Sequence, residues 1–402
     1  MNTSVRRYPL GTLSAEEFLH RYWQKAPLCI RGALASFTPP FTPEELAGLA
    51  LESEVESRLV QEHPSGQWQV SHGPFSEEDF TTLPESHWTL LVQEMNRHVP
   101  EMALLLQQFS FLPGWLLDDV MVSFAPIDGS VGPHADNYDV FIIQGSGRRR
   151  WQISHQSASA ADLLPNLPLR IHAHFVSEEE WILEAGDLLY IPAGMVHHGV
   201  ALEDSLSYSV GFRPPAIHQL IASYVDDYIT EARTRLEASQ EEEPFLYQPN
   251  LRAASHSGEI TLQTQQQVAA TVASIPLDTK AIGRWFGRYI TETTAETAAP
   301  YPAEELTLRQ LRERLSTQGE LWRSEYFRFS YIRGEDQQTY LYVGGEEYPL
   351  PSRLQPLIEM IASDRRFSLQ NLATAIGSFG EGWELLLTLY NRGALFFPDV
   401  DP

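Results

Sequence analysis

Residues 186–197 read Gly-Asp-Leu-Leu-Tyr-Ile-Pro-Ala-Gly-Met-Val-His (GDLLYIPAGMVH), and this stretch does most to decide the fold. The apolar run predicts a short buried strand, which we expect Gly186 to begin. Pro192-Ala193-Gly194 predicts a tight turn, because proline presets φ and glycine accepts positive φ. The chain should then return on a second strand that carries His197.

A second pattern, His134-Ala135-Asp136, lies upstream of this turn. Two residues apart on a strand, His134 and Asp136 would point to the same face. With His197 they would supply two imidazoles and one carboxylate, the facial set of non-haem iron(II) oxygenases, which leaves positions open for substrate and oxygen. We therefore predict these three residues as the metal ligands and catalytic centre. The alternative is a turn histidine after Gly132-Pro133 and a core histidine at 197.

Other histidines compete for the same role. His198 follows His197 directly and should point to the opposite strand face, although a β-bulge would exchange the two. His172-Ala173-His174 is another candidate metal pair, but it has no turn motif of its own. We interpret His172 and His174 as surface or packing residues.

Three consecutive arginines follow the first metal pattern. Residues 138–144 (YDVFIIQ) predict an apolar strand, 145–147 (GSG) a turn, and 148–153 (RRRWQI) the return strand. One arginine that projects into a barrel could form a bidentate pair with a carboxylate. The alternative is three solvated arginines after a hairpin turn.

The motifs carry a specific family resemblance. The pattern G-x5-P-x-G-x2-H of residues 186–197 resembles the second cupin motif of double-stranded β-helix proteins, and the HxD form of the first motif favours iron. The run 18–33 (FLHRYWQKAPLCIRGA) resembles the entry segment of JumonjiC hydroxylases. Residues 132–151 (GPHADNYDVFIIQGSGRRRW) resemble the bacterial ribosomal oxygenases of the YcfD or RoxA type.

The resemblance implies an iron(II)- and 2-oxoglutarate-dependent dioxygenase that uses O2 to hydroxylate an arginine of 50S ribosomal protein sixteen. It implies that Arg149, fifteen residues after His134, binds the distal carboxylate of 2-oxoglutarate, with Arg148 and Arg150 on the outer face. It also implies that Ser123 contacts 2-oxoglutarate, although Ser123 could simply be a strand residue bonded to backbone. Ala201 departs from the general cupin pattern, which often has asparagine there.

Two other functions stay open at this point. One is a related hydroxylase of histidine in another ribosomal protein, and the other is a non-enzymatic metal-binding cupin that acts as a scaffold. A guanidinium substrate would need carboxylates and aromatic faces near the metal. The candidates for this wall are Asp118, Asp119, Asn137 and Tyr138, with local packing or turn bonding as the alternative.

Composition limits the partners and the compartment. A net charge of −25 argues against a general nucleic-acid binder and would attract a basic partner such as a ribosomal protein, although acidity also serves solubility alone. With one cysteine, no disulfide can form within the chain. The first residues lack an apolar leader segment and no run is long enough for a membrane helix, so we expect a cytoplasmic protein.

The chain should divide into three parts. Residues 1–213 predict the mainly β catalytic domain, a double-stranded β-helix with helices near 14–25 and 87–108. Residues 214–298 predict a helical region with helices after Ile217, at 262–274 and from Asp278, separated by a loop at 241–258. Its apolar stripe suggests a homodimer surface, as the resemblance also implies, and packing onto the barrel is the alternative.

Residues 299–402 predict a winged-helix-like α+β domain. Helices are expected near 303–316, 351–363, 368–376 and 380–391, and strands near 325–333, 338–343 and 394–397. The candidate recognition helix, 381–392 (EGWELLLTLYNR), carries one arginine and two glutamates. Because a DNA-reading helix needs basic and amide side chains, we expect no direct DNA binding.

Overall fold

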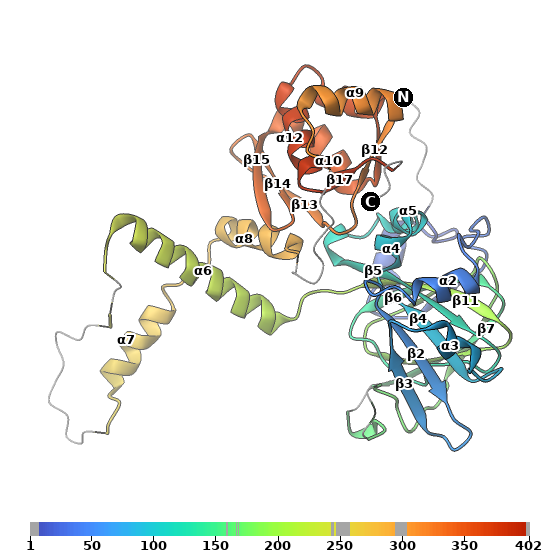
Figure 1. The fold of residues 1–402 in the computed structure, drawn as a ribbon. Helices are drawn as coiled ribbons and strands as arrows, with labels where there is room; N and C mark the ends of the chain where they lie inside the picture. The colour runs from blue at the N-terminus through green and yellow to red at the C-terminus, as the bar shows by residue number, and fades with distance from the viewer. Residues whose placement is uncertain are drawn as a thin grey trace. The chain divides into compact units, whose positions relative to one another are not determined.

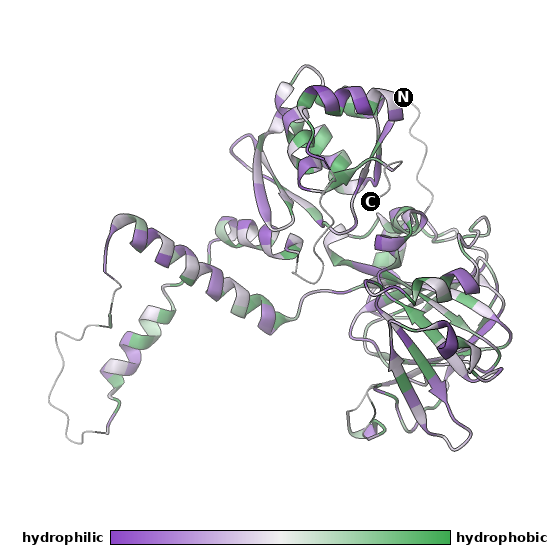
Figure 2. Cartoon of the chain, in the orientation of Figure 1, coloured by the Kyte–Doolittle hydropathy of each residue, from purple (hydrophilic) through white to green (hydrophobic). Residues whose placement is uncertain are grey.

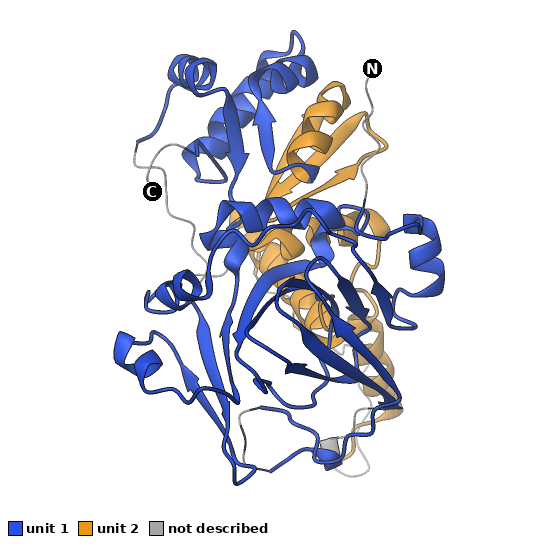
Figure 3. Ribbon diagram, turned by 90° about the vertical axis from the view of Figure 1, so that its right-hand side faces the viewer, with its two compact units in different colours: residues 1–214, 299–326, 363–402 blue, residues 215–298, 327–362 orange. Residues whose placement is uncertain are grey.

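The computed structural model describes residues 8–157, 160–165, 167, 169–242, 245–246, 258–293 and 304–398. The chain divides into two compact units (Figure 3). The first consists of residues 1–214, 299–326 and 363–402, and the second of residues 215–298 and 327–362. The division at 214–215 lies one residue from the predicted end of the catalytic domain. The division of the chain into three domains stays a prediction.

Two antiparallel sheets form the double-stranded β-helix of the first unit (Figure 1). The larger sheet has eight strands in the order β1-β9-β6-β11-β5-β4-β2-β3, and the smaller has the order β10-β7-β8. The strands of the larger sheet are β1 (Leu28–Ile30), β2 (Ser57–Glu62), β3 (Trp68–His72), β4 (Trp88–Val92), β5 (Leu117–Ala125), β6 (Asp139–Ser146), β9 (Leu188–Ile191) and β11 (Ser205–Phe212). Those of the smaller sheet are β7 (Arg149–Ser157), β8 (Glu179–Leu183) and β10 (Met195–Ala201).

Short helices accompany these strands in the first 214 residues. They are α1 (Ala15–Arg21), α2 (Pro43–Leu49), α3 (Glu77–Thr81), α4 (Met95–His98) and α5 (Pro100–Leu106), with 3-10 turns η1 (Gln107–Phe109), η2 (Gly114–Leu116) and η3 (Ala160–Asp162). Three of them begin with capping boxes, Ser14 with Glu17, Thr42 with Glu45 and Ser76 with Asp79, which satisfy free backbone N–H groups at the helix start.

Alternation along the central strands separates a core face from a site face. On β11, Leu206, Tyr208 and Val210 belong to the large hydrophobic cluster, and Val120 and Val122 of β5 join them. The intervening residues of both strands point to the opposite face, because successive strand side chains alternate. Figure 2 shows hydrophobic and hydrophilic residues mixed along the strands of this region. The hydrophobic cluster thus leaves the opposite face of these two strands available for polar residues.

The stretch 186–197 joins the two sheets rather than forming one hairpin. β9 pairs with β1 and β6 in the larger sheet, whereas β10 pairs with β7 in the smaller one. The expected return strand therefore exists, but it crosses to the other sheet. Gly186 does not begin the strand: it lies in the preceding turn at φ +88°, and the strand starts at Leu188. A side chain at Gly186 would be strained there whatever the surrounding space.

The N-terminal run fastens onto this same stretch. Arg31 forms an ion pair with Asp187 (Nη1–Oδ2 2.6 Å), and the Gly32 amide donates to the other oxygen of that carboxylate (2.8 Å). Gln24 donates from its backbone N–H to the Tyr190 hydroxyl (2.8 Å). The segment that resembles a JumonjiC entry segment thus holds the strand that leads to the metal motif.

Two sequence predictions in this region were wrong in detail. The helix predicted near 87–108 begins with a strand, β4, and only then continues as α4 and α5. Residues 88–92 are a short apolar run, and a buried strand of this length cannot be told from a helix by periodicity. The turn predicted at 145–147 is shorter, because β6 continues to Ser146.

The remaining part of the first unit contains α9 (Leu308–Gln318), β12 (Glu320–Arg323), β16 (Arg366–Ser368), α11 (Leu369–Ile376), α12 (Gly380–Asn391) and β17 (Leu395–Phe396). Its three strands form a sheet in the order β16-β12-β17. The four helices predicted after residue 300 are present, although the first starts at Leu308, where Thr307 and Gln310 form a capping box. Residue 303 of that prediction lies outside the described residues.

The second unit contains α6 (Ile217–Ser239), α7 (Leu262–Val272), α8 (Thr279–Thr291), a meander of β13 (Phe329–Arg333), β14 (Gln338–Val343) and β15 (Glu346–Pro351), then η5 (Ser352–Leu354) and α10 (Gln355–Ser363), of which Ser363 falls in the first unit. The three helices predicted between 214 and 298 are present. Most of the loop predicted at 241–258 lies outside the described residues. Among the described residues, no helix is long and apolar enough to cross a membrane.

Candidate active site

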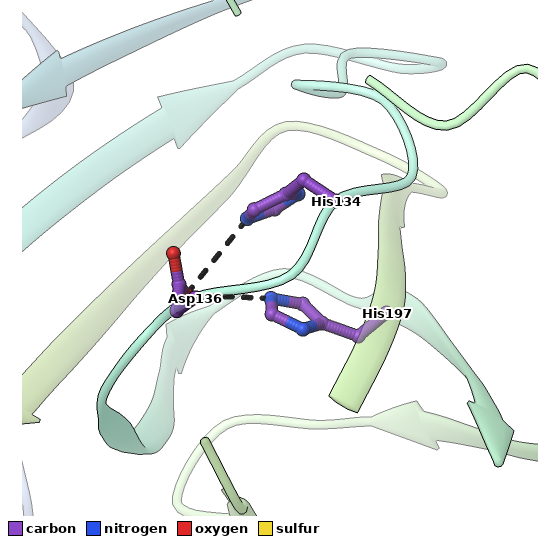
Figure 4. A group of neighbouring side chains, drawn as sticks. All are labelled: His134, Asp136 and His197. Atoms are coloured by element: carbon purple, nitrogen blue, oxygen red, sulfur yellow. Dashed lines mark ion pairs between the residues drawn. The ribbon is translucent and has the colours of Figure 1, made fainter. Parts of the chain in front are cut away.

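His134, Asp136 and His197 lie together, as the sequence predicts (Figure 4). One possible ligand atom from each falls within 4.8 Å of the other two. Asp136 Oδ2 lies 4.0 Å from His134 Nε2 and 3.7 Å from His197 Nε2. Such a group of two imidazoles and a carboxylate can hold a divalent metal ion on one face.

The backbone sets the spacing of the two histidines. His134 and His197 form an isolated antiparallel bridge, in which each amide donates to the other carbonyl (N–O 3.0 and 2.8 Å). His134 and Asp136 are therefore not on one regular strand, which corrects the sequence argument. Asp136 is held instead at the turn, where its carbonyl accepts from the Gly194 amide (2.7 Å). The Pro-Ala-Gly turn thus positions both His197 and the carboxylate.

Hydrogen bonds fix which imidazole nitrogen can bind a metal. His134 Nδ1 donates to the Gly132 carbonyl (2.9 Å), and His197 Nδ1 donates to the Met195 carbonyl (3.0 Å). Since a carbonyl only accepts, both rings keep their lone pair on Nε2, the atom that faces Asp136. Burial, and next the neighbouring His134, lower the pKa of His197 to about 4, so this ring is neutral at pH 7.

The competing histidines lie elsewhere. His198 is not in the group; its Nε2 lies 3.0 Å from the Ser130 hydroxyl, so no bulge exchanges it with His197. His172 and His174 both face Asp162, at Nδ1–O distances of 3.5 and 2.6 Å. His174 is exposed and His172 is buried, which agrees with their interpretation as surface and packing residues.

Arg149 occupies a buried site between the sheets. Its Nη1 donates to the Ser123 hydroxyl (2.9 Å), and its Nη2 donates to the Ser205 hydroxyl (3.1 Å). Ser123 lies opposite Ser207 in the register of β5 and β11, and their hydroxyl oxygens are 2.9 Å apart. Arg148, by contrast, is exposed and pairs with Glu203 (3.1 Å). Arg148 is thus exposed and Arg149 buried, as predicted, whereas Arg150, which was also predicted on the outer face, is half-buried.

Among the described residues, the charge of Arg149 has no counter-ion. Within the described part of the chain no carboxylate forms an ion pair with it, and burial lowers its pKa to about 10. The guanidinium is still protonated at neutral pH, and a buried unpaired charge is costly. This cradle of one guanidinium and three serine hydroxyls fits a carboxylate. Ala201, which lies opposite Arg149 in the register of β10 and β7, adds no polar group.

Beyond the Arg149 cradle, a polar hollow of about 370 Å³ lies on the larger sheet. Register places Ser123 opposite Ser207 and Met121 opposite Ser209, so the Arg149 cradle and the hollow share one face of β5 and β11. The hollow is lined by Glu56, Arg58, Gln93, Glu94, Asp118, Asp119, Met121, Tyr138, Val140, Ser209, Gly211 and Arg213.

Four of these lining residues are acidic. Asp119 is the most perturbed: burial raises its pKa to about 6, and the Glu94 amide, which donates to Asp119 Oδ2 (3.0 Å), opposes that rise. No lysine or arginine of the described residues lies within ion-pair distance of Asp119. Tyr138 presents an aromatic ring to the hollow, and Asp136 lies two residues before it. Asn137, the fourth predicted wall residue, is exposed and does not line the hollow.

Several of the polar residues were missed in the sequence. Ser205, Glu56, Glu94 and Arg213 carry no motif, and strand pairing alone brings them to the site. Ser205 could have been found only from the alternation of serines at 205, 207 and 209, once the strand was known to be central.

Comparison with known proteins identifies the class. Residues 104–220 match the JmjC domain family, and residues 273–396 match the ROXA-like winged helix family. These matches agree with the double-stranded β-helix and with the winged-helix-like fold predicted for the C-terminal region.

Individual relatives extend the match over the whole chain. The Escherichia coli ribosomal protein uL16 3-hydroxylase is 36% identical over 397 residues, which cover 96% of this chain and 98% of the relative. The X-ray structure of E. coli YcfD superposes with a TM-score of 0.81 at 34% identity, covering 96% of this chain and 98% of that one. A structure of the same ribosomal oxygenase in complex with cobalt and 2-oxoglutarate has a TM-score of 0.78 at 33% identity and covers 96% and 99%. The chain belongs to the JmjC-domain ribosomal oxygenases.

Proposed function

We propose that this protein hydroxylates an arginine side chain of large-subunit ribosomal protein uL16, with iron(II) as its metal. As a member of its family, the chain is an oxygenase that works with a metal ion, 2-oxoglutarate and dioxygen. Bound together, these three supply an oxidant able to hydroxylate an unactivated C–H bond. The protein residues bind, orient and exclude water.

The co-substrate assignments follow from the two polar centres. His134, Asp136 and His197 would hold the iron through two Nε2 atoms and one carboxylate oxygen. Arg149 would pair with the distal carboxylate of 2-oxoglutarate, with Ser123 beside it. The unpaired buried charge of Arg149 supports this role, because a dicarboxylate supplies the missing anion.

The observation that favours an arginine substrate is the acidic hollow on the site face. A guanidinium needs carboxylates and an aromatic face, and Asp119 with Tyr138 offers both. A neutral histidine side chain would leave Asp119 without a cation. The choice of uL16 comes from the name of the E. coli relative, which is a uL16 3-hydroxylase. The net charge of −25 of this chain suits a basic partner.

Peptide mass spectrometry tests the substrate directly. The purified chain is incubated with iron(II), 2-oxoglutarate and unmodified uL16 from the same organism. We expect a gain of one oxygen on an arginine. A gain of one oxygen on a histidine would show that histidine, and not arginine, is the substrate residue. Consumption of 2-oxoglutarate without a gain of oxygen on uL16 would exclude uL16 as the substrate. If 2-oxoglutarate were not consumed, the result would favour a non-enzymatic metal-binding scaffold.

Gly211 keeps the hollow open. A Cβ at this position would lie 3.5 Å from the Tyr138 ring and 3.7 Å from Asp119 Oδ1, which is ordinary contact. Gly211→Ala should therefore be tolerated, whereas the longer side chain of Gly211→Leu should enter the space between the ring and the carboxylate. We expect Gly211→Leu to lower kcat/KM for uL16 at least about 100-fold, the loss that misplacement by roughly 1 Å can cause.

Rates measured on uL16 for Gly211→Ala and Gly211→Leu, with 2-oxoglutarate binding as the reference, check this expectation. Full activity of Gly211→Leu would show that the substrate side chain enters elsewhere.

Substrate binding should depend on pH through Asp119. Because its carboxyl has a raised pKa of about 6, it is ionised at pH 7.5 and largely protonated at pH 5. A protonated carboxyl cannot balance a guanidinium, so KM for uL16 should rise as pH falls through about 6. Asp119→Asn should have a high KM at all pH values and lose this pH dependence. A wild-type KM that stays constant between pH 7.5 and 5.5 would contradict the role of Asp119; KM for 2-oxoglutarate over the same range controls for metal loss.

We also propose that α6 and α7 mediate a homodimer. None of their residues is buried within the described chain. Four of the exposed residues are large and apolar, with 62–77% of their surface exposed: Ile217, Ile221, Leu262 and Val272. Figure 2 shows hydrophobic and hydrophilic residues mixed along both helices. Apolar residues exposed on helices of this kind suit an isologous contact. Sedimentation equilibrium should give twice the chain mass of 45.5 kDa; a monomer mass would refute the dimer.

Two further proposals concern partners and location. We place the protein in the cytoplasm, where a ribosomal protein is accessible. We propose no direct DNA contact for the C-terminal region, because Glu381 and Glu384 lie on α12, the helix that would have to enter the groove. A DNA-binding assay at low salt with a mixed-sequence duplex would detect such a contact if it existed.

A further inference from the structure

The acidic hollow already contains a guanidinium of this chain. Arg213 Nε lies 2.8 Å from Asp118 Oδ2, and its guanidinium carbon lies 4.6 Å from the centre of the Tyr138 ring. An ion pair with a carboxylate and a stack on an aromatic face are the two contacts that a substrate arginine would seek there. The resident side chain and the proposed substrate side chain therefore have the same chemistry.

We propose that Arg213 is an internal competitor that occupies the guanidinium site and is displaced when the substrate arginine enters. This inference rests on the proposed function, since it assumes that the hollow receives the substrate. A substrate must then bind strongly enough to displace Arg213 before its own arginine can reach the metal. Arg213 would thereby help to determine substrate specificity.

The contacts of Arg213 are of a kind that can be exchanged. Its side chain is 57% exposed, and exposed ion pairs are weak and easily opened. Its backbone, in contrast, is fixed: the Arg213 amide donates to the Leu116 carbonyl (2.7 Å) directly after β11. Displacement thus needs only side-chain rotation, and the sheet does not have to move.

The other arginine of the hollow is differently placed. In the orientation that satisfies its hydrogen bonds, the Gln93 amide accepts from Arg58 and donates to Asp119 Oδ2 (3.2 Å). Arg58 therefore bonds to a neutral amide, and the carboxylate of Asp119 is left for an incoming cation. Arg213 pairs directly with Asp118, and its charge also opposes the rise that burial causes in the pKa of Asp119, without an ion pair, so both carboxylates act on the same resident guanidinium.

Arg213→Ala tests the proposal, with Arg148→Ala as its matched control. Arg148 is also half-exposed and also pairs with one carboxylate, Glu203, but it lies outside the hollow. We expect Arg213→Ala to lower KM for uL16 about three- to tenfold, the size expected for an exposed ion pair and one cation–π contact. Arg148→Ala removes the same unit of charge and should leave KM unchanged.

A measurement at higher ionic strength separates competition from a general charge effect. The comparison is repeated at an ionic strength of about 0.5 M, where long-range attraction between exposed charges is largely screened. The KM difference should persist there. A KM for uL16 that is unchanged or higher in Arg213→Ala would overturn the proposal and make Arg213 a supporting wall residue.

A binding measurement needs no turnover. Methylguanidinium chloride, titrated by calorimetry, should bind Arg213→Ala more tightly than wild type or Arg148→Ala, again by about three- to tenfold. Equal affinities would overturn the proposal. Tighter binding to Arg213→Ala, together with unmodified arginines in uL16, would keep Arg213 as the occupant of the site and reject only the proposed substrate.

Discussion

Asp136→Ala should abolish hydroxylation and strongly weaken metal binding. The replacement removes the one anionic group among the three side chains, leaving two neutral imidazoles. We expect the rate to fall at least about 100-fold, beyond the 10- to 100-fold typical when only a partner of a ligand is lost. Metal content after dialysis and the rate of 2-oxoglutarate consumption measure the two effects.

Asp162→Ala is the matched control for this variant. Asp162 also faces two histidines, His172 and His174, but it is outside the three-residue group. It should keep its metal and its rate. Coupled hydroxylation by Asp136→Ala, or an equal loss in both variants, would show that the three residues are not the metal ligands.

Arg149→Met should affect the protein in two opposite directions. KM for 2-oxoglutarate should rise roughly 100-fold, since a charge-assisted pair with a carboxylate contributes about 3 kcal/mol. The thermal stability without 2-oxoglutarate should instead stay equal or increase, because an apolar side chain of similar size replaces a buried charge without a counter-ion.

Melting temperatures with and without 2-oxoglutarate check both directions. The wild type should be stabilised by the ligand, and Arg149→Met should not. Arg148→Met, at the exposed neighbour, should behave as wild type. A normal ligand response in Arg149→Met would place the carboxylate contact at another residue.

The sequence predicts the metal group well because its geometry is local to two short motifs. The turn at 192–194 and the HxD pattern suffice to select His197 over His198, and the three side chains meet in the structure. Strand alternation does not position these residues, however, since His134 and Asp136 are held by a backbone bridge and a turn contact. The three predicted residues lie together although the expected strand is not there.

The acidic hollow was less predictable because long-range pairing creates it. Asp118, Asp119 and Tyr138 were candidates, but Glu94 and Arg213 come from separate segments that meet only when β4, β5 and β11 pair. Residues 88–92 illustrate the limit: an apolar run of that length fits a helix or a buried strand, and only its two neighbours in the sheet decide.

The reciprocal backbone bridge between His134 and His197 has a consequence for metal choice. Both histidine rings are held by a hydrogen bond from Nδ1 to a main-chain carbonyl, whereas Asp136 is held at the turn through its own backbone carbonyl and its side chain can still rotate. With two fixed imidazoles and one carboxylate that can rotate, the site can adjust to metal ions of different radius. Size should therefore discriminate poorly among divalent ions, and cobalt does occupy the E. coli relative in its complex with 2-oxoglutarate. Selection for a reactive ion would then fall to its redox chemistry and to its supply in the cell.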